Sequence, residues 1–113
     1  KSRAGRAIIQ NNAFDDTRGK ATNYMIDLPA GASGIIDKNV FVQGADKENF
    51  SAFIAIAAEG KVHNSAGLAI SGNDASIALG VNRSTIFVAD WSGDRLMLGA
   101  NRLGRGLSPF EKR

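Results

Sequence analysis

The hexapeptide Ile36-Asp37-Lys38-Asn39-Val40-Phe41 carries the pattern that decides the fold of this chain. An aliphatic residue is followed by two variable residues, an asparagine, one further residue and a bulky apolar residue. The pattern occurs three more times, at 9–14, 70–75 and 98–103, with an alanine as the last residue of 70–75. By subtraction of their numbers, the four asparagines are 27, 34 and 28 residues apart.

A repeat of this length, built from short β-type segments, predicts a β-solenoid. Because side chains alternate along a strand, the residues at every second position around each asparagine are expected to face inward. These are Ala7, Ile9, Phe14, Gly34, Ile36, Phe41, Leu68, Ile70, Ala75, Leu96, Leu98 and Leu103. A third strand is expected upstream, with Tyr24, Ile26, Leu28, Ile54, Ile56, Ile86 and Val88 inside. The sequence therefore predicts an all-β parallel β-helix of three to four coils, with three short strands per coil.

The repeated asparagine has a physical reason. At a sharp bend between strands, asparagine tolerates left-handed backbone better than most residues. Its amide carries both donors and acceptors. In coils stacked about 4.8 Å apart, successive amides can bond along the axis and satisfy polar groups buried at the bend. We therefore predict a structural ladder made of Asn12, Asn39, Asn73 and Asn101.

The hexapeptide at 36–41 resembles the coil consensus of the right-handed parallel β-helix superfamily, which includes pectate lyases, related polysaccharide lyases and phage tailspikes. The resemblance extends over residues 7–104. The segments 26–29 and 59–63 are also similar to bacterial β-helix-repeat proteins of unassigned function. The resemblance implies a right-handed, pectate-lyase-like coil in a secreted, periplasmic or cell-surface protein.

Two other structures are compatible with parts of the sequence. Many short strands with frequent turns also suit an antiparallel β-sandwich. A sandwich favours Asn-Gly or Asp-Gly hairpin turns, and the chain has neither dipeptide. The alanine-rich segment 51–59 has helix propensity, but the repeat requires a strand at this place.

A chain of 113 residues forms at most one domain. We interpret 1–113 as a single β-helix domain that supplies the C-terminal coils of a longer protein, with 105–113 as a C-terminal cap or tail. Leu107 and Phe110 are expected to plug that end. Nothing comparable precedes Ala7, so we expect the N-terminal coil end to be covered by a segment outside this sequence or by self-association.

Composition excludes several classes of function. The chain has no cysteine, which excludes disulfides and thiolate metal sites. It has no apolar run long enough to predict a membrane span. The net charge of +3 arises from basic residues near both ends, which we interpret as frayed termini. Nucleic-acid binding ranks last, since these basic residues have no aromatic rings among them on which bases could stack.

Catalytic motifs are absent: the sequence contains no serine nucleophile elbow, no HExxH helix and no EF-hand loop. Lyases with this fold use Arg or Lys, often with Ca²⁺, on one strand face of the central coils. Here the corresponding outward positions are expected to form an apolar stripe with one carboxylate. They are Met25, Asp27, Phe53, Ala55, Phe87 and Ala89.

One corner of the predicted solenoid collects residues suited to carbohydrate. Carboxylates bond sugar hydroxyls, an exposed ring stacks on sugars, and a histidine titrates near neutral pH. The candidate carbohydrate-binding residues are Asp27, Glu59, His63, Asp90, Trp91 and Asp94. The alternative is a solvated polar loop with the tryptophan against the strand face. His63 is the only histidine, which excludes a histidine-based metal cluster.

A second corner carries a weaker alternative. Four carboxylates there could bind Ca²⁺, but basic residues are interleaved with them, which favours a solvated charge network. The four are Asp15, Asp16, Asp46 and Glu48. We therefore predict no metal or other cofactor, with calcium as the alternative.

These observations favour a non-catalytic structural or glycan-contacting β-helix module, with an acidic or neutral polysaccharide as its partner. The alternative is a part of a carbohydrate-active enzyme, either a polysaccharide lyase or a glycoside hydrolase, in which the corner of Glu59 and Asp94 contributes to the substrate groove. The catalytic residues of such an enzyme cannot be assigned from this sequence.

Overall fold

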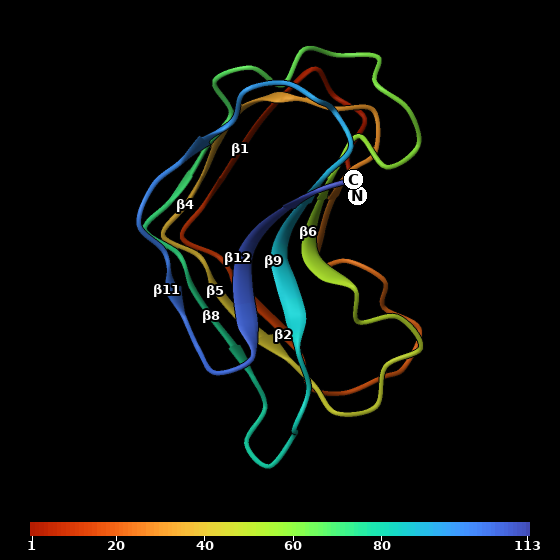
Figure 1. The fold of residues 1–113 in the computed structure, drawn as a ribbon, viewed down its shortest axis with the longest axis vertical. Helices are drawn as coiled ribbons and strands as arrows, with labels where there is room; N and C mark the ends of the chain where they lie inside the picture. The colour runs from red at the N-terminus through yellow and green to blue at the C-terminus, as the bar shows by residue number, and fades with distance from the viewer.

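The computed structural model describes all residues 1–113 and contains twelve strands and no helix (Figure 1). The strands form three parallel four-stranded sheets. The chain visits the three sheets in the same order four times, so each circuit is one coil with three strands. The molecule is therefore a parallel β-helix of four coils, as the repeat predicts, and its principal extents are 38 × 26 × 22 Å.

Each sheet takes one strand from every coil. The first sheet contains β1 (Arg6–Gln10), β4 (Ser33–Asp37), β7 (Ala69–Ser71) and β10 (Met97–Leu98). The second contains β2 (Ala13–Asp16), β5 (Val40–Gln43), β8 (Asp74–Ile77) and β11 (Arg102–Leu103). The third contains β3 (Ile26–Leu28), β6 (Ala52–Ile56), β9 (Thr85–Asp90) and β12 (Leu107–Lys112).

The register places equivalent residues of the repeat above one another. In the first sheet Ile9 pairs with Ile36, which pairs with Ile70, and that residue pairs with Leu98. In the second sheet the equivalent row is Phe14, Phe41, Ala75 and Leu103. Both rows belong to the core or pack against it, except that Leu98 at the end of the first row is 38% exposed. The inward positions predicted for these two sheets are therefore confirmed for the apolar side chains other than Leu98, whose short strand at the end of the sheet leaves it exposed.

Phe41 lies at the centre of an aromatic cluster that fills the coils. Its ring stacks on Phe14 at a centroid distance of 4.9 Å and meets Phe87 edge-on at 5.5 Å. Phe53 lies 6.4 Å from Phe41 and 6.2 Å from Phe87. Aromatic pairs in these geometries add favourable quadrupole interactions to the burial of apolar area.

This cluster corrects the prediction for the third sheet. Phe53 and Phe87 were assigned to an outward apolar stripe, but both are fully buried and pack on Phe41 from the opposite sheet. Ala55 and Ala89 are also fully buried. Simple alternation fails here because almost every residue of β6 and β9 is buried, so hydrophobicity does not distinguish the two faces.

The asparagine ladder is confirmed in full. The side-chain oxygen of Asn39 accepts from the main-chain and side-chain nitrogens of Asn12 at 3.0 and 3.1 Å. Asn73 accepts in the same way from Asn39, and Asn101 accepts from Asn73. Each side-chain nitrogen also donates to main-chain carbonyls of the bend, such as Ile36 O from Asn73 at 3.0 Å. Asn39 and Asn73 are almost fully buried.

The left-handed residue of the bend is not the ladder asparagine itself. Positive φ occurs one position earlier, at Asn11 (58°), Lys38 (55°) and Gly72 (66°). The ladder asparagine is therefore selected by its hydrogen bonds and not by its tolerance of left-handed backbone. This corrects one of the two reasons given for the pattern.

Both ends of the chain lie beside the third sheet but at its opposite edges, β3 and β12, and the two termini overlap in the view of Figure 1. The main-chain nitrogen of Ser2 donates to Asp27 O at 2.9 Å, which places the N-terminal residues along the outer edge of β3. Residues 107–112, assigned above to the cap, form β12 and pair with β9. Leu107 and Phe110 pack against the core from this strand.

We predict that Asn73→Ala lowers the free energy of unfolding by about 3 kcal/mol or more, because it leaves the buried N–H groups of Asn39 and the carbonyl of Ile36 without partners. Asn12→Ala is the matched control. Asn12 is exposed and its side chain only donates, so its loss should cost less than about 1 kcal/mol. Urea unfolding measures both values, and equal losses would contradict a stabilising ladder.

Candidate functional site

The predicted carbohydrate-binding residues lie on the side of the solenoid where the third sheet leads into the first. Asp27 belongs to β3, and Asp90 ends β9. Glu59 and His63 lie in the long loop between β6 and β7, at the upper right of Figure 1. The remaining two, Trp91 and Asp94, lie in the loop between β9 and β10.

Asp27 and Glu59 are brought together by the N-terminus. Lys1 Nζ lies 3.4 Å from Asp27 Oδ2 and also bonds to Glu59 Oε1. Arg3 pairs with the other Glu59 oxygen at 2.5 Å. The hydrogen bond from Lys1, followed by that from Arg3, lowers the pKa of Glu59, and the bond to Glu59 raises the pKa of Lys1. Both oxygens of Glu59 are therefore engaged by basic groups of the same chain.

Asp94 forms a separate cluster. Lys61 donates to its Oδ1 at 2.5 Å, and the main-chain nitrogen of Ser65 donates to Oδ2 at 2.8 Å. The bond from Lys61 and then the bond from Ser65 lower the pKa of Asp94. The buried hydroxyl of Ser65 accepts from Ala32 N at 3.0 Å. These bonds connect the corners of coils two and three to the corner of coil one, which contains Ala32 and leads into β4.

The histidine and the remaining aspartate are also tied to main-chain groups. His63 Nε2 lies 3.1 Å from Arg3 O, and Gly5 lies so close to the ring that a β-carbon would come within 3.1 Å of Nδ1. Asp90 is buried, and its Oδ1 accepts from Ser92 N at 2.8 Å. Its Oδ2 is buried without a partner.

Trp91 is half-buried against the core and meets the edge of Tyr24 at 6.5 Å between ring centroids. The guanidinium of Arg113 lies 5.2 Å from the Trp91 ring centroid, in a cation–π contact, and pairs with Glu111 at 2.8 Å. Part of the tryptophan surface is therefore occupied by the C-terminal residue.

The contribution of the N-terminal residues was missed from the sequence. Lys1 and Arg3 were interpreted as frayed, yet they supply the partners of Glu59 and Asp27. The signal that could have found them is spacing. Two basic residues two positions apart face the same side of an extended segment, and the corner beside the edge strand is rich in carboxylates.

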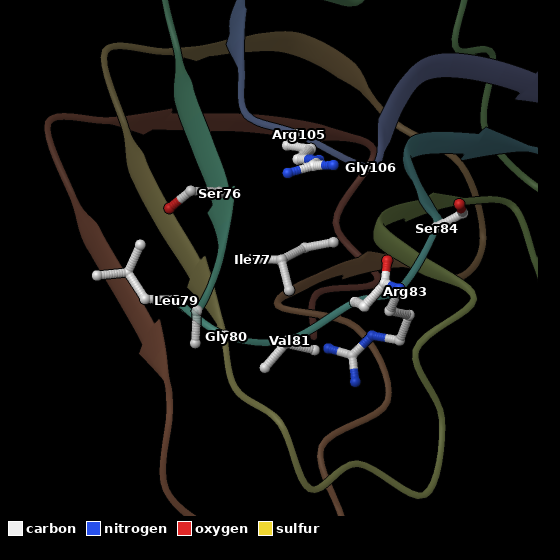
Figure 2. Close-up of a pocket in the computed structure, with 11 residues that line it drawn as sticks. Ser76, Ile77, Leu79, Gly80, Val81, Arg83, Ser84, Arg105 and Gly106 are labelled. Atoms are coloured by element: carbon white, nitrogen blue, oxygen red, sulfur yellow. The ribbon is translucent and has the colours of Figure 1, made fainter.

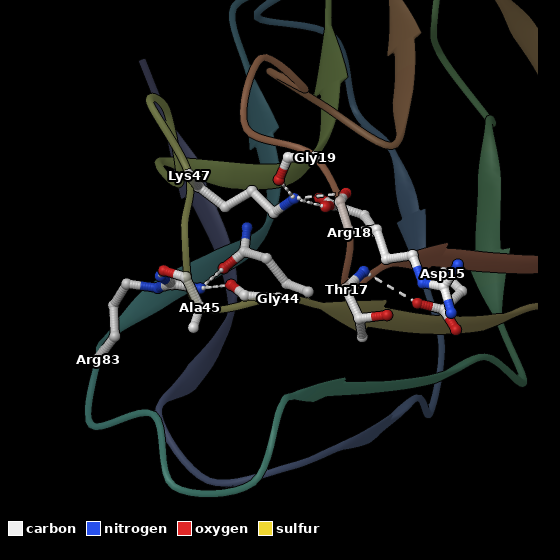
Figure 3. A network of polar contacts seen from close by, with 10 residues as sticks. Asp15, Thr17, Arg18, Gly19, Gly44, Ala45, Lys47 and Arg83 are labelled. Atoms are coloured by element: carbon white, nitrogen blue, oxygen red, sulfur yellow. Dashed lines mark hydrogen bonds and ion pairs between the residues drawn. The ribbon is translucent and has the colours of Figure 1, made fainter.

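The alternative calcium site is not assembled. No group of three or more His, Cys, Asp or Glu side chains gathers in a way that could hold a metal ion. Instead Lys47 inserts its ammonium between the corners of coils one and two, where it pairs with Asp16 and donates to Gly19 O at 2.8 Å (Figure 3). The Lys47 side chain is fully buried, whereas Asp15 caps Thr17 N at 2.9 Å.

Arg83 ties the next pair of corners together. Its guanidinium donates to Gly44 O and to Gln43 Oε1, both at 2.7 Å, and to Ala45 O at 3.0 Å (Figure 3). The same guanidinium lies 4.8 Å from the ring centroid of Phe50. Corners of coils one to three are thus joined by two basic side chains that bond mainly to carbonyl groups.

The pocket in Figure 2 lies beside these corners and was not predicted from the sequence. It has a volume of about 750 Å³ and is lined by residues 76–84 together with Arg105 and Gly106. It forms because the corner of coil three runs from 78 to 84, whereas the corresponding corner of coil four has only residues 104–106. The loop 78–84 of coil three therefore extends beyond the short corner 104–106 of coil four. Corner length can be compared only between two strands, and the sequence predicted a third strand in three coils and none after the short corner at 104–106.

The polar groups of this pocket include one basic side chain without an intramolecular partner. Arg105 is exposed and forms neither an ion pair nor a side-chain hydrogen bond. Ser76, Asn82 and Ser84 add hydroxyl and amide groups, and Ile77 adds an apolar surface. Figure 2 shows Arg105 and Arg83 on opposite sides of Ile77.

No family model, no curated protein and no solved structure matches this chain. The structure also contains no helix with the length and apolar content needed to cross a membrane.

We predict that the free energy of unfolding falls as the pH is lowered below about 4.5, because Glu59 and Asp94 have folded-state pKa values below their ordinary values of 4.5 and 3.8. The unfolded chain then binds protons more readily than the folded chain, so the stabilisation present above the ordinary values is lost on acidification. Urea unfolding as a function of pH measures this. Glu59→Gln should weaken the dependence of the free energy of unfolding on pH. Glu48→Gln is the control: it removes an exposed carboxylate without an ion pair, so the loss of stability at low pH should remain.

We further predict that Lys47→Met lowers the free energy of unfolding by about 3–5 kcal/mol, because it leaves the Asp16 carboxylate buried without its counterion. Adding Asp16→Asn should restore part of the loss. Lys38→Met, at an exposed lysine without an ion pair, should change stability by less than about 0.5 kcal/mol. A loss no larger for Lys47 than for Lys38 would show that the buried pair has no structural role.

Proposed function

We propose that this chain is a non-catalytic, glycan-contacting β-helix module and that the pocket bounded by residues 76–84 holds a unit of the glycan. The pocket volume of about 750 Å³ is the observation that carries this proposal, since ligand sites commonly occupy about 300–1,000 Å³. Its lining combines an unpaired cation, hydroxyls, an amide and an apolar side chain.

This set of groups suits a sugar. Hydroxyl and amide side chains such as Ser76, Asn82 and Ser84 both donate and accept, as sugar hydroxyls do. Ile77 offers an apolar contact for the carbon face of a ring. Arg105 favours a saccharide that carries a carboxylate, because its guanidinium can bond both oxygens of that group. An acidic polysaccharide is therefore the preferred partner.

The non-catalytic part of the proposal is supported by the corner that contains Glu59, His63 and Asp94. A general acid or base must reach a proton of the substrate, and these carboxylates are already bonded to basic groups of the chain. The alternative of a lyase or hydrolase has no specific observation in its favour. Membership in the pectate-lyase-like superfamily and a secreted, periplasmic or cell-surface location remain parts of this proposal.

The Trp91 corner is the second place at which a glycan could contact the module. Trp91 and Tyr24 are half-exposed, and aromatic rings with exposed faces stack on sugars. The two locations are separable, because Arg105 lies between the second and third sheets and Trp91 lies between the third and first.

We predict that Arg105→Gln weakens binding of an acidic oligosaccharide by about 10- to 100-fold, the effect of losing a hydrogen bond to a charged group worth about 1.5–3 kcal/mol. Calorimetric titration with an oligouronate and with a neutral oligoglucoside of equal length measures the effect. The loss should be confined to the acidic ligand.

Arg102→Gln is the matched control, since Arg102 is an exposed arginine of the same coil that does not line the pocket. If both variants lost the same affinity for the acidic oligosaccharide, the effect would arise from net charge, and binding in the pocket would be contradicted. A loss caused by Tyr24→Ala and not by Arg105→Gln would move the site to the Trp91 corner. Absence of binding to any glycan of a broad array would remove the proposed function.

A further inference from the structure

The outer face of the first sheet carries a row of apolar side chains that crosses all four coils. Ile8 pairs with Ile35, which pairs with Ala69, and that residue pairs with Met97. The row faces outward because its neighbours in sequence, such as Ile9 and Ile36, face the core. We call this row the first-sheet stripe.

The stripe is exposed. Ile8, Ile35 and Met97 are 55%, 36% and 63% accessible, and they are three of the eight large hydrophobic residues exposed in the chain. A hollow of about 710 Å³ adjoins the C-terminal end of the stripe and is lined by residues that include Ala69 and Met97. A contiguous apolar row with a hollow is typical of an interaction surface, whereas single exposed apolar residues are ordinary.

Charges without partners flank the stripe on its two sides. Arg6 and Arg95 lie two residues before it in coils one and four, and both are exposed and take part in no ion pair. Asp37 lies two residues after it in coil two and also has no ion pair, with one carboxylate oxygen buried and unpartnered. One flank is therefore basic, and the other carries a carboxylate.

We propose that a second copy of this chain docks on the first-sheet stripe and forms a two-fold symmetric dimer in which the solenoid axes run parallel. Two sheets pack face to face about 10 Å apart, with the apolar rows in the middle. The symmetry is closed, so each copy uses the same surface and no fibre results. This surface is separate from the pocket of the proposed function and does not depend on it.

The flanking charges select this arrangement. With the two-fold axis parallel to the solenoid axis, the flank of Arg6 faces the flank of Asp37 of the other copy, one coil apart, which an arginine side chain can span. With the axis perpendicular to the solenoid, Arg6 would face Arg95 of the other copy, and like charges disfavour that contact. Lys38, the residue after Asp37, lies in the bend beyond the end of β4, so it does not belong to the flank of the sheet that carries Asp37.

The size of the face predicts a weak dimer. Four strands about 4.8 Å apart, the longest of which have five residues at about 3.3 Å each, give a face of at most about 16 × 19 Å on each copy. The total area that such a pair buries lies below the roughly 1,200–2,000 Å² of standard stable interfaces. We therefore expect an association that depends on concentration.

Sedimentation equilibrium of the full chain over about 10 µM to 1 mM, the range of weak interfaces, tests the proposal. The wild type should move from monomer to dimer and not to larger species. Ile35→Lys or Met97→Lys should raise the dissociation constant by about tenfold or more, because each places a charge in the centre of the interface. Val62→Lys is the matched control, since Val62 is 76% exposed outside the stripe, and it should leave dimerisation unchanged.

Charge exchange tests the geometry. Arg6→Asp and Asp37→Arg should each weaken the dimer, and the double variant should recover most of the loss, because each copy then presents the exchanged pair. Urea unfolding of the variants establishes that they fold, and retained glycan binding by Ile35→Lys separates this surface from the pocket. A wild type that stays monomeric at 1 mM, roughly the upper limit of this weak range, or a dimer that tolerates Ile35→Lys and Met97→Lys, would overturn the proposal.

Discussion

The asparagine ladder is the interaction on which the rest of this molecule depends. A parallel β-helix bends sharply three times in each coil, and every bend leaves main-chain groups that strands cannot pair. At one of the three bends, a stacked amide accepts from the coil before it and donates to the coil after it. This fixes the register of the first and second sheets, which meet there, and so places Phe14 and Phe41 in one row inside.

The fold was predictable from the sequence because every position of the ladder requires the same residue type, an asparagine. Only an amide supplies both a donor and an acceptor of the right length, so the same residue type recurs at Asn39 and Asn73. The third sheet has no such marker. Its two central strands, β6 and β9, are buried on both faces, so alternation could not distinguish Phe53 from Ile54, and the short corner before β12 concealed the fourth strand.

The candidate site was less predictable, for a related reason. Glu59, Trp91 and Asp94 lie on the neighbouring loops where the repeat placed them, yet the partners of Glu59 came from the chain terminus, 56 to 58 residues away in sequence. Ion pairs between surface residues that are distant in sequence produce no repeating pattern in the sequence. The buried Lys47 was likewise counted as a solvated charge, because sequence alone does not reveal that the adjacent corners fold over it.

The ladder also has a direction. Every amide-to-amide bond is donated toward the C-terminal coil, so Asn12 begins the series with an uncommitted oxygen and Asn101 ends it with an uncommitted main-chain N–H. Duplicating or deleting one whole coil preserves every bond in this series, because each unit presents the same acceptor to the unit before it. The length of such a protein can therefore change by complete turns during evolution, while a change by a fraction of a turn would break the series.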